Sequence, residues 1–436
     1  MVVLRNFKNI FLVTELRNKL MFTLGVLAVY RFGVHIPIPG INVYALGSLF
    51  KSNIAGGLLS YLDLFAGGAL RNFAIFALGI SPYISASIMM QLLTVMIPTL
   101  EQLSKEGEYG RRIINQYTRY LTLGVSLIQG FGISAYVESN PGLVLNPGWS
   151  FKLTSTLILV VGSMFVMWLG EQINAHGIGN GSSVIIFAGI VAGLPDAIIK
   201  LSNFIMEGQT DPLLALALLF VTLLVIVCVI FLEKGERRVP VQYAKRVIGH
   251  KVYGGQSSYI PLKLNPSGVI PVIFASSLLT FPMTIVGALS RKFPSLTILS
   301  EWLNMGALHY TLMAALIIFF SFFYTAVIFN PAELADNIRK SGGFIPGIRP
   351  GKRTSEFFDY LLTRIGLPGS IYLALLAILP GILRQIMGFP IMFSGISLLI
   401  VIGVAMDTSA QIESHLIERR YEGFLSTGKL KGRYGR

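Results

Sequence analysis

The chain has 436 residues, of which 53% are hydrophobic and only 13% are charged, and its formal net charge is +14. Soluble domains carry about 25% charged residues, so a chain of this size with so little charge cannot cover a water-soluble globule. The composition excludes a soluble protein and predicts one that is solvated largely by lipid.

Apolar segments recur along the chain, and each transmembrane helix needs roughly 20 such residues. The first segment is short and carries Arg31 near its end, whereas the others contain no Lys, Arg, Asp or Glu. In chain order they are 20–34, 72–100, 120–137, 153–170, 172–195, 212–232, 264–290, 302–332, 365–383 and 385–406. The sequence therefore predicts an all-α integral membrane protein with ten spans.

The stretch Leu58–Phe65, which precedes the second span, is half-apolar and lies between glycine pairs at 56–57 and 67–68. It is too short to span a membrane and too apolar for a free surface loop. One interpretation is a re-entrant helix packed inside the protein, where irregular backbone is tolerated at membrane depth. The other is an amphipathic helix that lies on the outer leaflet. The composition of the segment fits both.

A weak internal repeat relates Gly79–Ser87 to Gly268–Ser276, because Gly, Pro, Ile, Ala and Ser fall at the same offsets in both. Each copy lies in an apolar segment that contains proline. Repeats of this kind are typical of a membrane pathway formed by two related halves. Chance agreement is the alternative, since these residues are common in membrane helices.

Most of the 35 Lys and Arg residues lie in the two termini and in three alternate loops, 98–119, 233–266 and 331–364. Basic loops stay on the cytoplasmic side, so both termini are predicted there. The second and seventh spans then run in opposite directions. We therefore predict two inverted five-helix halves, 1–205 and 206–436, related by an axis in the membrane plane.

Two of these basic loops are larger than orientation requires. In 233–266, Val239, Val241 and Tyr243 alternate with other residues, which predicts a β-hairpin. In 331–364, the Gly- and Pro-rich stretch 342–353 predicts turns. Basic residues on projecting loops fit an anionic partner such as RNA phosphate or an acidic protein face. The alternative is contact with anionic lipid headgroups only.

Acidic and basic residues are nearly absent from the middle of the predicted spans, and no nucleotide-binding loop or Cys and His cluster is visible. The sequence therefore predicts no enzyme activity, no cofactor and no metal. An inverted-repeat secondary transporter for a small molecule shares the predicted symmetry, but it usually places ionisable groups at this depth.

Several motifs resemble the SecY/Sec61-alpha family of protein-conducting channel subunits over nearly the whole chain. They are Phe76–Ser87, Lys105–Glu108, Gln116–Arg119, Gly177–Gly181 and Gly342–Gly351. The resemblance implies a passive channel in the bacterial inner membrane for unfolded polypeptides, with a lateral gate that releases helices into lipid. It also implies SecE-like and SecG-like subunits, driving partners (the SecA ATPase, or a ribosome bound through rRNA) and binding of signal sequences.

The resemblance further implies roles for individual residues. The pore ring would consist of Ile80, Ile84, Ile186, Ile190, Ile273 and Ile400. The plug would be the segment 58–72 with Phe65, Gly67 and Gly68, and the lateral gate would be formed by Ser85, Gln129 and Asn265. The residues that dock SecA or the ribosome would be Arg246, His250, Lys251 and Arg349. Asp63 in the plug, Ser182 beside the ring and His250 at a loop tip depart from the family pattern. For any single Ile, contact with lipid or a neighbouring helix is the simpler explanation.

Overall fold

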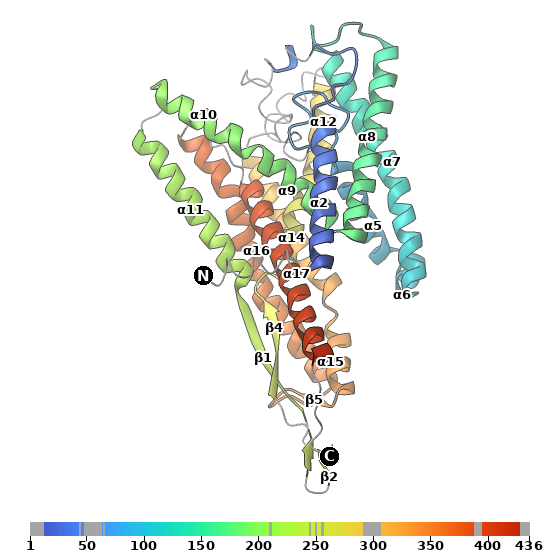
Figure 1. Cartoon of the computed structure of the whole chain (residues 1–436), viewed down its shortest axis with the longest axis vertical. Coiled ribbons are helices and arrows are strands. Elements are labelled where there is room, and N and C mark those ends of the chain that lie inside the picture. Colours follow the sequence, from blue (N-terminus) through green and yellow to red (C-terminus); the bar gives the residue numbers. More distant parts are fainter. Residues whose placement is uncertain are drawn as a thin grey trace. The chain divides into compact units, whose positions relative to one another are not determined.

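The computed structural model of the protein is drawn in Figure 1. It describes residues 13–42, 45–47, 63, 66–140, 142–208, 212–243, 246–248, 251–253, 257–290, 307–387 and 395–427. The chain forms two compact units, one of Met1–Pro195 with Val404–Arg436 and one of Asp196–Gly403. The predicted halves, 1–205 and 206–436, are related by inverted symmetry. A division by contacts does not test that symmetry, so the two halves stay a prediction.

The first unit is helical. It contains α2 (Thr14–Gly33), α5 (Ser81–Met96), α6 (Pro98–Lys105), α7 (Glu108–Glu138), α8 (Trp149–His176) and α9 (Gly181–Ala192). Helices α5 and α8 both pack against α7. The last helix, α17 (Gly395–Thr427), begins in the second unit and joins the first from Val404 onward.

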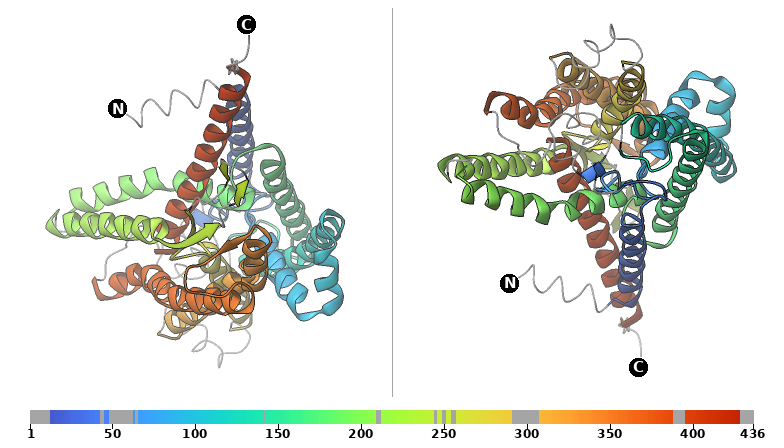
Figure 2. Two further views of the ribbon diagram at one scale, coloured as in Figure 1. Left: turned by 90° about the horizontal axis from the view of Figure 1, so that it is seen from below. Right: turned by 90° about the horizontal axis from the view of Figure 1, so that it is seen from above.

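The second unit combines helices with two small sheets. Its helices are α10 (Leu194–Met206), which begins at the end of the first unit, α11 (Pro212–Lys234), α12 (Ile270–Ser290), α14 (Ala307–Ile328), α15 (Pro331–Lys340) and α16 (Lys352–Met387). Helices α10 and α11 follow each other as a helical hairpin (Figures 1 and 2). The strands are β1 (Glu236–Tyr243), β2 (Arg246–Ile248), β3 (Lys251–Tyr253), β4 (Ser257–Lys263) and β5 (Gly343–Phe344).

The apolar segment 72–100 is not one continuous helix. Residues 66–80 form successive turns, and helix α5 begins only at Ser81, with Pro82 in its first turn. Proline suits this position because the first helical residues need no backbone N–H. The helix ends at Met96, since Ile97 is held extended before Pro98, and α6 then leaves at a bend of 100°.

The predicted span 172–195 is also divided. Helix α8 continues to His176, and α9 begins only at Gly181. The break contains Gly179 at φ +89°, and the Asn180 side chain caps α9 by accepting a hydrogen bond from the Ser183 N–H. Positive φ is easy for glycine and costly for other residues, so this glycine interrupts the helix.

Several helices overrun their predicted apolar segments at charged ends. Helix α7 begins at Glu108, α16 begins at Lys352 inside the predicted loop 331–364, and α17 continues to Thr427. Absence of charge marks where a helix can lie in lipid, and it does not mark where the helix ends.

Six helices of the described residues are long and apolar enough to cross a membrane, or seven if the bent pair of α5 and α6 is one span. A helix also coincides with each remaining predicted segment, namely α2, α11 and α12. The structure is thus that of a helical membrane protein, and the count of ten spans stays a prediction.

The two copies of the internal repeat adopt the same local structure. Gly79 and Gly268 have φ of +56° and +61°, and helices α5 and α12 begin two positions later, at Ser81 and Ile270. A proline, Pro82 or Pro271, follows as the next residue in each copy. The shared offsets therefore encode one motif, in which a left-handed glycine starts a helix with proline in its first turn.

The predicted hairpin in 233–266 is confirmed. Strand β1 pairs antiparallel with β4, so that Val239 lies opposite Ile260 and Val241 opposite Ser258. Strand β5 from the other basic loop pairs with the opposite edge of β1, giving the order β4-β1-β5. Strands β2 and β3 form a separate two-stranded sheet toward the end of the hairpin (Figure 1).

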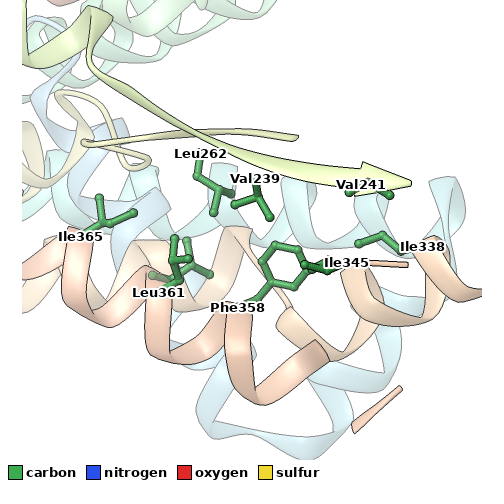
Figure 3. Packing of buried hydrophobic residues seen from close by; sticks show 9 residues of the cluster. Val239, Val241, Leu262, Ile338, Ile345, Phe358, Leu361 and Ile365 are labelled. Carbon is green, nitrogen blue, oxygen red and sulfur yellow. The ribbon is translucent and has the colours of Figure 1, made fainter. Parts of the chain in front are cut away.

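A hydrophobic cluster joins the two basic loops into one folded module (Figure 3). Its buried members come from β1, β4, α15, the turn after β5 and the first turns of α16: Val239, Val241, Leu262, Ile338, Ile345, Phe358, Leu361, Leu362 and Ile365. We call residues 236–263 and 331–365 the cytoplasmic module, after the side of the membrane on which these loops are predicted to lie. The sequence indicated the two loops separately and gave no sign that they share a core.

Candidate functional site

The four predicted pore residues of the first unit are all buried. Ile84 lies on α5, and Ile186 and Ile190 lie one helical turn apart on α9. We predicted Ile80 to lie within the same helix as Ile84, but it is the N-cap of α5. The Ile80 carbonyl accepts a hydrogen bond from the Ile84 N–H at 3.1 Å. The Ile80 side chain also lies against α8, because a Cβ added at Gly170 would be 3.4 Å from its Cδ1.

The two predicted pore residues of the second unit, Ile273 on α12 and Ile400 on α17, are buried as well. Burial of all six side chains fits a site inside protein better than one facing lipid. The ring itself, which needs both units, stays a prediction.

The described part of the plug segment is held by the helices around it. The Tyr30 hydroxyl donates to the Ala66 carbonyl at 3.1 Å, and the Arg31 guanidinium donates to the Gly67 carbonyl at 2.8 Å. Gly67 has φ +62°, and a Cβ there would lie 2.8 Å from the Cα of Gly189 on α9. Gly67 is therefore required twice, by its backbone conformation and by this close approach. Residues 66–72 form turns and Phe65 lies outside the described residues, so the plug helix stays a prediction.

The Asp63 side chain bonds to two residues farther along the same segment. Its buried carboxylate pairs with the Arg71 guanidinium at 2.6 Å and accepts the backbone N–H groups of Leu70 at 3.0 Å and Arg71 at 3.2 Å. We call this arrangement the Asp63 clasp. The charge of Asp63 is thus balanced by a cation eight residues along the chain.

The predicted gate residues lie in different surroundings. Ser85 on α5 and Gln129 on α7 are buried in the first unit, and the Ser85 hydroxyl has no hydrogen-bond partner among the described residues. Asn265 precedes α12 in the second unit and is already bonded within it. Its Nδ2 donates to Glu233 Oε1 at 3.0 Å and to the Gly268 carbonyl at 2.8 Å, and its Oδ1 accepts from Ser267 at 3.0 Å. Sequence analysis missed Glu233, which looked like the first residue of a charged loop.

The loop before α9 is fixed by side chains from three helices, which the sequence did not reveal. The Ile178 N–H donates to Thr23 of α2 at 3.1 Å, the Gly179 N–H to Gln411 of α17 at 2.9 Å, and the Gly181 N–H to Asn174 of α8 at 2.7 Å. Ser182 hydrogen-bonds to the side chain of Asn180 at this loop. These bonds fix the start of the helix that carries Ile186 and Ile190.

The predicted docking residues belong to the cytoplasmic module. Arg246 and Lys251 lie on β2 and β3, His250 is outside the described residues, and Arg349 is exposed in the turn before α16. The buried Thr354 hydroxyl donates to the Arg349 carbonyl at 3.0 Å. The backbone that presents the Arg349 side chain is therefore fixed.

Positive charge is left over on this module. Three of its arginines have an acidic neighbour: Arg238 pairs with Glu236, Arg339 with Asp336 and Arg353 with Glu356. Among the described residues, exposed basic side chains of the module without an ion pair are Arg237, Lys263, Lys340, Arg349, Lys352 and Arg364. The surface can therefore attract an anionic partner. In the part of the chain that the structure describes, no group of three or more His, Cys, Asp or Glu residues could hold a metal ion.

A family model described as SecY matches residues 74–409. The chain is 48% identical to protein translocase subunit SecY of Escherichia coli (strain K12) over 431 residues, which cover 97% of this chain and 96% of that protein. It is 43% identical to protein translocase subunit SecY of Aquifex aeolicus (strain VF5), covering 96% and 98% of the two chains.

Solved structures share the fold. A protein-conducting channel matches with a TM-score of 0.66 at 18% identity, and the match covers 95% of each chain. Sec61 in a canine ribosome-channel complex matches with a TM-score of 0.64 at 18% identity, again over 95% of each chain. The resemblance predicted from the sequence motifs is confirmed, and the chain belongs to the SecY family.

Proposed function

We propose that this protein is the pore-forming subunit of a protein translocase. It conducts unfolded polypeptides across the membrane and releases apolar helices sideways into lipid, without making or breaking a covalent bond. The observation that carries this proposal is the sequence identity of 48% and 43% to two protein translocase subunits, over nearly the full length of the chain. Helices of sufficient length and apolarity to cross a membrane agree with it.

The proposed architecture has ten spans in two inverted halves, in the bacterial inner membrane, with both termini in the cytoplasm. Its support is the motif at Gly79 and Gly268, which starts one helix in each half with the same turn and the same proline offset. The distribution of basic residues supports the orientation.

The six buried isoleucines form the proposed pore ring. Branched aliphatic side chains offer no hydrogen bond to water, so a narrow ring of them loses its water and resists ions. The same side chains make no specific bond to a passing peptide, so one ring admits many sequences. A ring of polar side chains would hold some substrates and conduct protons.

Photocrosslinking tests this pathway. A photoreactive side chain at Ile84, or at Ile273, should form adducts with a stalled secretory chain, because these residues would contact the polypeptide directly. The control position is Leu157 of α8, whose side chain is 65% exposed and would face lipid. Adducts at Leu157 without adducts at either isoleucine would exclude the proposed pathway.

The segment around Gly67 is the proposed plug, which closes the channel at rest. Its support is the set of bonds from Tyr30, Arg31 and the Asp63 clasp. These bonds are few among the described residues of the segment, so a polypeptide that enters can displace the segment at modest cost.

Removal of the clasp should therefore make the resting channel leak. Asp63→Ala removes the ion pair with Arg71 and the carboxylate that accepts hydrogen bonds from two backbone N–H groups, each hydrogen bond contributing about 0.5–1.5 kcal/mol. We expect several-fold faster ion flux through idle channels in vesicles, and a smaller rise for Asp63→Asn, which keeps an acceptor. Asn72→Ala, a change of a neighbouring polar residue, is the control. Equal flux in Asp63→Ala and the control would show that the clasp does not keep the channel closed.

The cytoplasmic module is the proposed docking surface for the SecA ATPase and for ribosomal RNA, through Arg246, His250, Lys251 and Arg349. Its support is the buried hydrophobic cluster of the module and the module's exposed basic side chains that have no ion pair among the described residues. SecE-like and SecG-like subunits complete the proposed complex, and the outward-facing apolar helices contact membrane lipids. The proposed lateral gate uses Ser85, Gln129 and Asn265, with a signal sequence as the ligand that opens it.

A further inference from the structure

We propose that Glu233 is a positioning residue for the lateral gate: it fixes the amide of Asn265 so that Asn265 meets the gate as a hydrogen-bond acceptor. The inference rests on the gate under the proposed function and adds a residue to it. Glu233 lies at the end of α11, and its side chain is 7% exposed, while Asn265 is 2% exposed. A buried carboxylate without hydrogen bonds is costly, so this contact stabilises both groups.

The surroundings of Asn265 determine which way its amide points. Its Nδ2 faces two oxygens, Glu233 Oε1 at 3.0 Å and the Gly268 carbonyl at 2.8 Å. The flipped amide would place Oδ1 against both of these acceptors, which repel it. The orientation therefore follows from the chemistry of its neighbours.

This network uses up the donors of Asn265. Both Nδ2 hydrogens are bonded within the second unit, whereas Oδ1 accepts one bond, from Ser267, and keeps a second lone pair. Ser267 in turn contacts the Ser321 hydroxyl of α14 at 3.3 Å. Any gate partner that reaches Asn265 without breaking the network must supply a hydrogen. The Ser85 hydroxyl and the Gln129 amide are groups of that kind.

Loss of Glu233 frees the Asn265 amide to rotate. The gate hydrogen bond must then form from a less ordered side chain, so it stabilises the closed gate less. A membrane hydrogen bond contributes about 0.6–1.7 kcal/mol, which corresponds to about a three- to twentyfold change in the gate equilibrium. We expect Glu233→Ala to raise export of a reporter with a shortened, defective signal sequence by a factor in this range. Export of the same reporter with an intact signal should change little, because that signal already opens the gate.

The measurement is the ratio of export with the defective signal to export with the intact one. A purely structural defect lowers both exports together and leaves the ratio unchanged. Glu233→Gln keeps an oxygen acceptor for Nδ2 and should restore the wild-type ratio. Glu413→Ala, which removes an exposed glutamate from α17, is the control for loss of one carboxylate.

The outcomes separate this inference from the gate itself. An unchanged ratio in Glu233→Ala overturns the positioning role, and so does a Glu233→Gln variant that behaves like Glu233→Ala. Gln129→Leu is measured in parallel. If it raises the ratio while Glu233→Ala does not, the gate stands and the inference fails. If neither variant raises the ratio, the proposed gate fails as well.

Discussion

The Arg349→Glu variant is expected to lose SecA-driven export by at least about tenfold while it still inserts into the membrane. A charge-assisted hydrogen bond contributes about 1.5–3 kcal/mol, so its loss alone corresponds to about a ten- to hundredfold effect. Reversal of the charge adds repulsion toward an anionic partner. The Arg349 side chain is exposed, and its backbone is held by Thr354, so the substitution leaves the core of the module intact.

Export and SecA binding are measured in inverted membrane vesicles that contain equal amounts of each variant. The control is Arg111→Glu, which makes the same change in net charge at an exposed arginine in the first turn of α7, a helix that is not part of the module. Wild-type export by Arg349→Glu would exclude this residue from the docking site. A similar loss in Arg111→Glu would mean that total charge, and not position, is what the partner senses.

The Phe358→Ala variant is expected to unfold the cytoplasmic module. Phe358 is completely buried at the centre of the cluster, and truncation of such a side chain costs about 3–5 kcal/mol. A small module stabilised by one cluster cannot absorb a loss of this size. The hairpin should become several-fold more sensitive to protease added on the cytoplasmic side, and export should fall with it.

Phe357→Ala is the matched control, because Phe357 is the adjacent residue and is only partly buried against the same cluster. Its truncation should have a clearly smaller effect on both readouts. If the hairpin of Phe358→Ala resists protease as the wild type does, then the two loops do not depend on a shared core. If protease sensitivity rises without loss of export, the docking surface does not need the folded module.

Sequence patterns were sufficient where one physical rule dominates. Absence of charge located the apolar helices, since lipid excludes unpaired ions. The valines at 239 and 241 gave the hairpin, because alternate residues of a strand share a face. The offsets of Gly79 and Gly268 located the same helix start twice.

The sequence was insufficient where tertiary contacts decide. The break at Ile97 and the turns at 72–80 lie inside an uncharged segment, so hydropathy cannot detect them, although Pro82 and Pro98 mark both helix starts. Glu233 and Asn265 are 32 positions apart, and the pairing of their side chains depends on how α11 and the start of α12 pack. The clasp of Asp63 with Arg71 is local, but a charged pair in a loop has no pattern that distinguishes it from two solvated residues.

The cytoplasmic module separates two demands on its sequence. Every described member of the cluster belongs to the base, whereas Arg246 and Lys251 lie on the small β2–β3 sheet beyond it. Substitutions of Arg246 or Lys251 therefore leave every described member of the cluster in place. The side chains that stabilise the module and the residues predicted to meet a partner are therefore different sets of positions.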